Sequence, residues 1–179
     1  FGDRDEIEEL VHHAHGLGFS VSCDLLINLP GQSLAQMLDD LAIADGMGFD
    51  QICVYHLVLF EGLGTPWSED RSLLAALNDN AGAFANQRLC RKRLYELGFS
   101  QTTLTNFERR ASPRPRFQYE PLGFQPDQHD LLGFGPGAIS LAADRDFHRA
   151  WKTLRAQETA GYMRGAQRGF VFGEDDMRL

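Results

Sequence analysis

The sequence predicts an α/β fold, in which a parallel sheet with intervening helices is followed by a second region of different character. Helix-like and strand-like segments alternate over the first 98 residues, and the loops between them are short. The hydrophobic pattern changes after Gly98. Alternation with short loops is typical of parallel βαβ units. The 179 residues suffice for one domain, or for one large and one small domain.

Each element of the first part has its own signal. The helical segments repeat apolar residues at a spacing of three and four, and the strand segments are continuous apolar runs with β-branched residues. Ser33 and Gln36 form a capping box, which marks a helix start. We expect a helix over 5–15, a buried strand over 19–27, a helix from 33 to about 44, a buried strand over 52–60, and helical structure over 72–97 with an interruption near Gly82.

The two predicted strands do not make a complete sheet. A parallel sheet is normally covered on both faces and has several strands. We therefore expect the sheet to continue in sequence outside this chain or to pair with another chain. The chain opens on Phe1 rather than Met, which favours the interpretation that it is a fragment.

The second part predicts a small α+β region. We divide the chain into residues 1–98 and 99–179 on this basis. The expected elements are an edge strand over 100–106, a proline-containing loop over 107–130, an apolar glycine-rich segment over 131–141, a helix over 147–162, and an apolar patch with an acidic end over 170–179.

Composition narrows the classes of partner. The net charge of -8 argues against nucleic acid, which needs clustered Lys and Arg. No apolar run approaches the roughly 20 residues that a membrane span requires, and no signal peptide is evident. We therefore expect a cytoplasmic protein. The basic run over 109–116 is interpreted as a solvated loop, with contact to an anionic ligand as the alternative.

Cysteine and histidine positions predict no metal site. The cysteines, Cys23, Cys53 and Cys90, lie far apart and are interpreted as small buried residues. His12 and His15 share a helix face without a third ligand, so a solvated face is the simpler interpretation than zinc. His129, between Asp127 and Asp130, is a weaker metal candidate.

The stretch over 24–32 is the most informative candidate site. Asp24 lies in an apolar strand, where a carboxylate is unfavourable unless it is paired or binds a ligand. The carboxyl ends of parallel strands are where α/β sheets bind ligands. The alternative is that Asp24 caps a neighbouring loop. His56, at the end of the next strand, is either a general acid or base or a satisfied core residue.

Two glycine-rich segments also need an explanation. The segment over 61–66 is either a binding loop or a turn. The segment over 132–138 lacks the GxGxxG spacing and contains Pro136, so we reject a dinucleotide-binding interpretation. Its glycines instead predict a close approach of the backbone to another backbone or to a ligand.

Taken in order, these motifs resemble radical S-adenosylmethionine proteins of the oxygen-independent coproporphyrinogen III oxidase family. Residues 24–33 match a D-L-I-x-G-L-P-G-Q-T-like strand motif, with Asn28 in place of the usual glycine. Residues 52–59 and 64–66 match an I-S-x-Y-x-L-x-x-E-P-G-T-P-like motif, and residues 132–140 match L-G-x-G-P-G-A-x-S. The order and spacing agree over most of residues 2–162.

The resemblance implies the C-terminal part of a partial parallel (β/α) barrel of the TIM type, followed by the small α+β region. It implies S-adenosylmethionine and a [4Fe-4S] cluster as cofactors, and an electron donor protein as a partner. By position, Asp24 would contact the ribose or methionine part of S-adenosylmethionine, and the backbones of Leu26 and Val58 would flank its adenine.

The resemblance also implies a substrate and its alternatives. The parent protein is expected to generate a 5′-deoxyadenosyl radical that acts on a tetrapyrrole or a similar conjugated small molecule. The CxxxCxxC cluster motif is absent, so we expect this chain alone to be inactive. The alternatives are a haem-transfer chaperone, a natural-product methyltransferase or cyclopropanase on the same scaffold, and a different TIM-barrel enzyme with similar loops.

Overall fold

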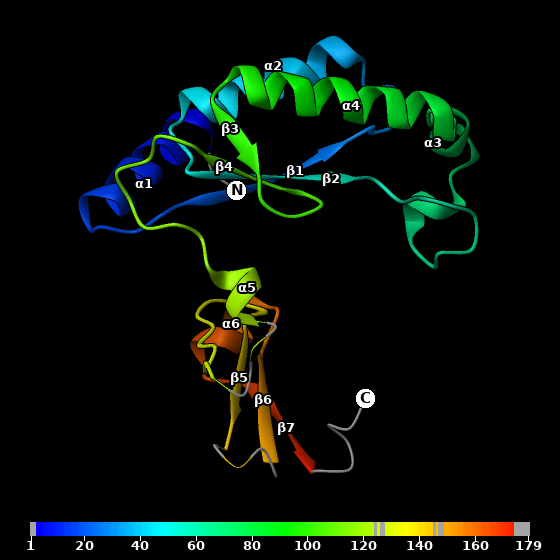
Figure 1. Cartoon of the computed structure of the whole chain (residues 1–179). Coiled ribbons are helices and arrows are strands. Elements are labelled where there is room, and N and C mark those ends of the chain that lie inside the picture. The colour runs from blue at the N-terminus through cyan, green and yellow to red at the C-terminus, as the bar shows by residue number, and fades with distance from the viewer. Residues whose placement is uncertain (1–2, 124, 126–127, 145, 147–148, 174–179) are drawn as a thin grey trace. The chain divides into compact units, whose positions relative to one another are not determined.

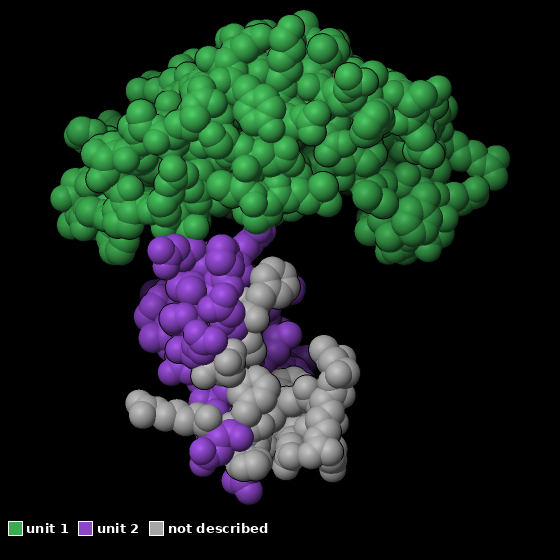
Figure 2. Space-filling model, in the orientation of Figure 1, with its two compact units in different colours: residues 1–117 green, residues 118–179 purple. Residues whose placement is uncertain are grey.

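The computed structural model describes residues 3–123, 125, 128–144, 146 and 149–173. The chain forms two compact units, Phe1–Phe117 and Gln118–Leu179, which are coloured separately in Figure 2. Each unit has its own sheet. We therefore describe each unit by itself.

The first unit alternates helices and strands in its first half (Figure 1). Its elements, in order, are α1 (Arg4–Gly16), β1 (Ser22–Ile27), α2 (Leu34–Gly46), β2 (Gln51–His56), the 3-10 helix η1 (Pro66–Glu69), α3 (Arg71–Ala75), α4 (Asn80–Glu96), β3 (Phe99–Gln101) and β4 (Asn106–Arg109). The predicted helices and both strands of its first half are present, with shifted ends. The Ser33–Gln36 capping box forms at the start of α2, as predicted.

The sheet of the first unit contains one parallel pair. Its strand order is β1-β2-β4-β3, with β1 parallel to β2 and both other pairs antiparallel. The predicted edge strand over 100–106 is wrong in its extent, because the chain turns after Gln101 and returns as β4. This mixed sheet does not amount to a barrel in the described residues.

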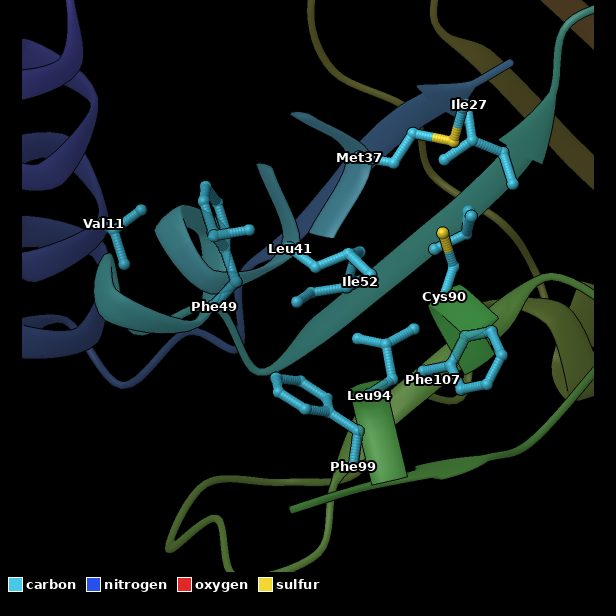
Figure 3. Close-up of a cluster of buried hydrophobic side chains, with 12 residues drawn as sticks. Val11, Ile27, Met37, Leu41, Phe49, Ile52, Cys90, Leu94, Phe99 and Phe107 are labelled. Atoms are coloured by element: carbon cyan, nitrogen blue, oxygen red, sulfur yellow. The ribbon is translucent and has the colours of Figure 1, made fainter. Parts of the chain in front are cut away.

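The core lies between one face of this sheet and the helices. Ile52 and Phe107 lie on this face and are 0% and 4% exposed. Met37, Leu41 and Leu94 approach them from α2 and α4 and are each 0% exposed (Figure 3). Burial of large apolar side chains is the dominant favourable contribution to folding. The labelled side chains in Figure 3 mark this core: Val11, Ile27, Met37, Leu41, Phe49, Ile52, Cys90, Leu94, Phe99 and Phe107.

Strand β1 is not buried on both faces, contrary to the prediction, whereas Gln51–Val54 of β2 are buried throughout. In β1, Asp24 and Leu26 are exposed, whereas Ile27 is buried. Alternate residues of a strand point to opposite faces. The apolar run therefore predicted the strand correctly but overestimated its burial, because helices pack on one face of the described sheet.

The predicted interruption of the helix over 72–97 is displaced. Helix α3 ends at Ala75 and α4 begins at Asn80, so the break precedes Gly82. The side chain of Asp79 accepts a hydrogen bond of 2.7 Å from the Gly82 backbone N–H and caps α4. The capping aspartate, rather than the glycine, sets this boundary.

The second unit is built on an antiparallel sheet. Its elements are α5 (Tyr119–Gly123), β5 (Ile139–Ala143), β6 (Arg149–Arg155), α6 (Thr159–Met163) and β7 (Gln167–Gly173), with strand order β5-β6-β7. The predicted helix over 147–162 is wrong, because β6 pairs with both β5 and β7. Residues 147–148 and 174–179 lie outside the described residues.

The boundary between the two compact units follows Phe117, whereas the sequence analysis divided the chain after residue 98. Strands β3 and β4 join the sheet of the first unit, so that unit extends to Phe117. The division after residue 98 was drawn for a barrel followed by a small α+β region, and it stays a prediction. Among the described residues, no helix combines the length and apolar character that crossing a membrane requires.

Candidate functional site

Asp24 and Leu26 lie side by side on the face of β1 that the helices leave open. Both side chains are exposed, with Leu26 47% exposed. The parallel register places Asp24 beside Cys53 and Leu26 beside Tyr55 on β2. Tyr55 is 37% exposed. A carboxylate and two apolar or aromatic surfaces therefore share one side of this strand pair.

Val58 lies beyond the strand rather than within it. Strand β2 ends at His56, and Val58 follows in an irregular segment, where it is 66% exposed. The Leu57 backbone N–H still donates to the Ile27 carbonyl oxygen at 3.1 Å. This hydrogen bond keeps the segment that leads to Val58 beside the end of β1.

The remainder of the open face is polar. The Ser22 hydroxyl donates to the Gln51 side chain at 3.0 Å, linking β1 to β2. On β4, the buried Glu108 carboxylate accepts a hydrogen bond of 2.9 Å from Arg116. A face that carries such polar side chains is suited to a polar ligand rather than to packing of a hydrophobic core.

Asn28 is the buried centre of a hydrogen-bond network at the carboxyl ends of β1 and β2. The other side chains of this network are exposed or half-buried: those of His56, Asn78 and Asn86. Asn28 is 1% exposed and has a positive φ of 61°. Asparagine tolerates this left-handed conformation better than most residues, although glycine adopts it most readily. Its amide nitrogen donates to His56 Nδ1 at 3.1 Å and to the Ala83 carbonyl oxygen at 3.3 Å. Its amide oxygen accepts from Asn78 at 3.3 Å and from Asn86 at 2.8 Å.

The turn after Asn28 is fixed by its own sequence. Gly31 has a φ of 73°, and its backbone N–H donates to the Ala76 carbonyl oxygen at 3.2 Å. The Gln32 side chain accepts a hydrogen bond of 3.2 Å from the Leu29 N–H. The Asn-Leu-Pro-Gly-Gln motif thus forms a rigid turn at the end of β1.

The basic run over 109–116 binds the protein itself. Arg109 pairs with Asp45 at 2.8 Å and lies 4.6 Å from the Phe99 ring centroid. Arg110 donates to the carbonyl oxygens of Phe99 and Tyr95. Arg114 pairs with Asp50 and Arg116 with Glu108. Both sequence interpretations, a solvated loop and an anion site, missed this use of the four arginines.

Asp50 is a second buried centre, which the sequence analysis did not identify. Burial opposes the charged form, but hydrogen bonds from the Val21 N–H, Ser112, Arg114 and His15 outweigh it and hold the pKa of Asp50 below its ordinary value. His15 Nε2 lies 2.9 Å from the Asp50 carboxylate. His15 therefore has a partner within the protein, and the described residues contain no group of three or more His, Cys, Asp or Glu that could hold a metal ion.

The comparisons with known proteins give one structural match. Neither the protein-family models nor the curated proteins match this chain. Coproporphyrinogen III oxidase (HemN) from Escherichia coli, described as a radical SAM enzyme, superimposes with a TM-score of 0.58 at 21% sequence identity. The chain is similar in fold to this radical SAM enzyme. The match covers 98% of this chain and 42% of that of HemN, so the chain spans less than half of its length.

The cysteines of this chain do not form a site for the iron–sulfur cluster of a radical SAM enzyme. Cys23, Cys53 and Cys90 lie on β1, β2 and α4. Burial raises the pKa of the Cys23 thiol to about 12 and that of Cys90 to about 11. A cluster needs several cysteine ligands around one site, whereas in the described residues these cysteines belong to no group of three or more His, Cys, Asp or Glu that could hold a metal ion.

The glycine-rich motif over 132–140 has a structural role. A side chain at Gly133 would lie 2.3 Å from the Ile139 carbonyl oxygen, and Gly135 and Gly137 have φ values of 104° and 74°. The Gly133 N–H donates to Ser140 Oγ, and the Gly135 N–H donates to the Tyr162 hydroxyl. The predicted close approach of the backbone is confirmed, and at Gly133 the partner is another backbone segment rather than a ligand. Of the weaker metal candidate at His129, Asp127 lies outside the described residues.

Proposed function

We propose that this chain is part of a radical S-adenosylmethionine enzyme, similar to coproporphyrinogen oxidase, that acts on a tetrapyrrole or a similar conjugated molecule. In this proposal the first unit belongs to a partial (β/α) barrel. The open face of its sheet would then face the inside of that barrel. The similarity in fold to HemN supports the proposal, together with the three sequence motifs.

The observation that carries the proposal is that Asp24 and Leu26 lie next to each other on one face of β1. An exposed carboxylate and an exposed apolar side chain thus share the open face, beside Tyr55 and toward the carboxyl end of a parallel strand pair. S-adenosylmethionine has a flat adenine base, ribose hydroxyl groups next to it, and a methionine ammonium group at its other end. The residues present therefore fit both chemical characters of this cofactor.

Each of these residues has a separate role in the proposal. The Asp24 carboxylate accepts hydrogen bonds from the ribose hydroxyls or the methionine amino group. The backbones of Leu26 and Val58 contact opposite faces of the adenine. Because the Leu57 N–H is bonded to the Ile27 carbonyl oxygen, these two backbone segments stay at a fixed separation.

The cluster would be held by cysteines outside this chain. Bound together, S-adenosylmethionine and a reduced [4Fe-4S] cluster supply a 5′-deoxyadenosyl radical, and an electron donor protein would provide the electron. The described residues contribute the S-adenosylmethionine site and part of the substrate surface. The exposed apolar side chains after β2, Val58, Phe60 and Trp67, are 66%, 53% and 61% exposed and would suit a flat conjugated substrate.

The proposal is tested with the protein expressed from its complete reading frame. Substituting Asp24→Asn removes the charge and keeps the shape of the side chain. We expect its affinity for S-adenosylmethionine, measured anaerobically by equilibrium dialysis, to fall by about tenfold or more, as for the loss of a charge-assisted hydrogen bond.

Asp39 is an exposed carboxylate on α2, so Asp39→Asn is the matched control and should leave the affinity for S-adenosylmethionine unchanged. Equal affinity of the Asp24→Asn and parent proteins would show that Asp24 is not part of the site. Tight stoichiometric binding of haem without any binding of S-adenosylmethionine would favour the haem-transfer alternative instead.

A further inference from the structure

The side-chain amide of Asn28 uses its full hydrogen-bonding capacity. Its nitrogen has two hydrogens, which reach His56 Nδ1 and the Ala83 carbonyl oxygen. Its oxygen accepts from the amide nitrogens of Asn78 and Asn86. A buried polar side chain with all its hydrogen bonds made is held in one orientation, whereas its removal leaves its buried partners unpaired, which is unfavourable.

The surroundings fix which way this amide points. The Ala83 carbonyl oxygen can only accept a hydrogen bond, so the nitrogen of Asn28 must face it. The same nitrogen therefore donates to His56, and His56 Nδ1 must be the acceptor. It follows that the neutral His56 ring has its proton on Nε2. This geometry does not leave Nδ1 free to act as a base.

The network joins the ends of β1 and β2, which belong to the candidate site, to helix α4 on the other face of the sheet. Asn28 follows β1, His56 ends β2, and Ala83 and Asn86 lie in the first turns of α4. Residue Ile27 pairs with His56 in the register, so the ring lies on the helix side of the sheet, opposite to Asp24 and Leu26. His56 is thus unsuited to touch a ligand that binds on the open face.

We propose that Asn28 is a positioning residue for the S-adenosylmethionine site and acts through His56. Its left-handed backbone sets the turn that follows Leu26, and its amide holds His56, which precedes the segment of Val58. The two backbones proposed to enclose the adenine are thereby kept at one separation. This inference rests on the proposed function.

The first test reads the hydrogen bond itself and needs no cofactor. In the 179-residue chain, two-bond ¹H–¹⁵N spectra above the titration range of histidine should show His56 with a bare Nδ1 and a protonated Nε2. In Asn28→Gly, which keeps the positive φ without strain, the ring should return to the tautomer mixture of free imidazole. A proton on Nδ1 in the parent chain would overturn the inference.

The second test measures affinity for S-adenosylmethionine in the protein from its complete reading frame. Asn28→Gly and His56→Leu should each weaken binding by about tenfold, because both break the link between the strand ends. His56→Asn should bind within about twofold of the parent protein, since its amide oxygen takes the position of Nδ1 and accepts from Asn28. Circular dichroism at the temperature of the assay verifies that each variant is folded.

The outcomes separate this inference from the proposed function. If Asp24→Asn weakens binding but Asn28→Gly and His56→Leu do not, the site is correct and the positioning role is wrong. If His56→Asn loses affinity as much as His56→Leu, the acceptor role of Nδ1 is wrong. If the parent protein does not bind S-adenosylmethionine, the proposed function fails and the positioning role fails with it, whatever tautomer the spectra show.

Discussion

Asp50 is the residue at which a single substitution should most disturb the first unit. Its side chain is 5% exposed and accepts hydrogen bonds from Ser112, Arg114 and His15. Removal of a buried, paired charge leaves its partners unsatisfied. We expect Asp50→Asn to lower the free energy of unfolding by about 2–3 kcal/mol, measured by urea denaturation.

Asp45→Asn is the control for this prediction. The Asp45–Arg109 pair is 26% and 24% exposed, and Arg109 keeps its hydrogen bonds to the Phe49 carbonyl oxygen without it. Its loss should lower the free energy of unfolding by less than about 1 kcal/mol. Equal losses for the two variants would contradict the central role of Asp50.

The same carboxylate predicts a pH dependence. The pKa of Asp50 is lowered below its ordinary value of 3.8 in the folded state, so its stabilising effect is present above 3.8 and is lost as the pH falls through the folded value. The difference in unfolding free energy between the parent chain and Asp50→Asn should therefore narrow below about pH 4. A difference that stays constant down to about pH 2 would show that the charge of Asp50 is not the cause.

Sequence reasoning identified Asp24 but not Asn28 or Asp50. Asp24 stood out as an acid within an apolar run, and the structure places it on the open face. Its role in binding stays a prediction. The importance of Asn28 depends on Asn78, Ala83 and Asn86, which lie at least 50 residues away along the chain. The one local signal was an asparagine in a motif position that usually holds glycine, which indicates a positive φ.

At the scale of elements, α4 is held by a few side chains of its buried face. Leu94 is 0% exposed, whereas Leu89 on the same helix is 43% exposed. Leu94→Ala should lower the free energy of unfolding by about 2–5 kcal/mol, because it leaves a cavity among Ile52, Phe99 and Phe107. Leu89→Ala should lower it by less than about 1 kcal/mol. Similar values for both would mean that α4 does not pack on the sheet through this face.

The start of helix α2 allows the contribution of a capping box to stability to be measured. The Ser33 hydroxyl accepts a hydrogen bond from the Gln36 N–H, and the Gln36 side chain accepts from the Ser33 N–H. Ser33→Ala should destabilise the first unit by about 1 kcal/mol in thermal or urea unfolding. Gln36→Glu keeps an acceptor at the same position and should be close to neutral. A loss as large in Gln36→Glu would point to a cause other than the cap.

Helices with caps and regular apolar spacing were predicted correctly, whereas strands whose conformation depends on hydrogen bonds to neighbouring strands were not. Helices α1 and α2 have caps and regular apolar spacing, and both were placed within two residues at their starts. Strand β6 was taken for a helix because Trp151 and Leu154 are three residues apart, a spacing that also fits a strand whose neighbours are unknown. All of strand β4 except Asn106 lay in the predicted loop over 107–130, because its partners β2 and β3 decide its conformation.

At the scale of the whole molecule, the division into two units predicts independent responses to mutation. In Gly133→Ala the new side chain would meet the Ile139 carbonyl oxygen at 2.3 Å, whereas Gly169→Ala would meet nothing within 4 Å. We expect Gly133→Ala to speed amide exchange in β5 and β6 of the second unit and to leave amide exchange in the first unit unchanged. Loss of protection in β1 and β2 would contradict the division.

The sequence predicted the α/β class and the parallel pair, but not how the sheet is completed. The parallel pair follows from helix, strand and loop lengths alone. The antiparallel hairpin and the second sheet depend on contacts between short segments with weak patterns of their own. The barrel, the cluster and the substrate depend on the resemblance and stay predictions.

The most direct test of the central proposal is the detection of 5′-deoxyadenosine. The protein from its complete reading frame would be reconstituted with iron and sulfide under anaerobic conditions, then given S-adenosylmethionine and dithionite. We expect 5′-deoxyadenosine in the parent protein and a reduction of about tenfold or more in Asp24→Asn. The proposed function would be wrong if the reconstituted protein binds a cluster yet forms no 5′-deoxyadenosine, and the role of Asp24 would be wrong if Asp24→Asn forms as much as the parent protein.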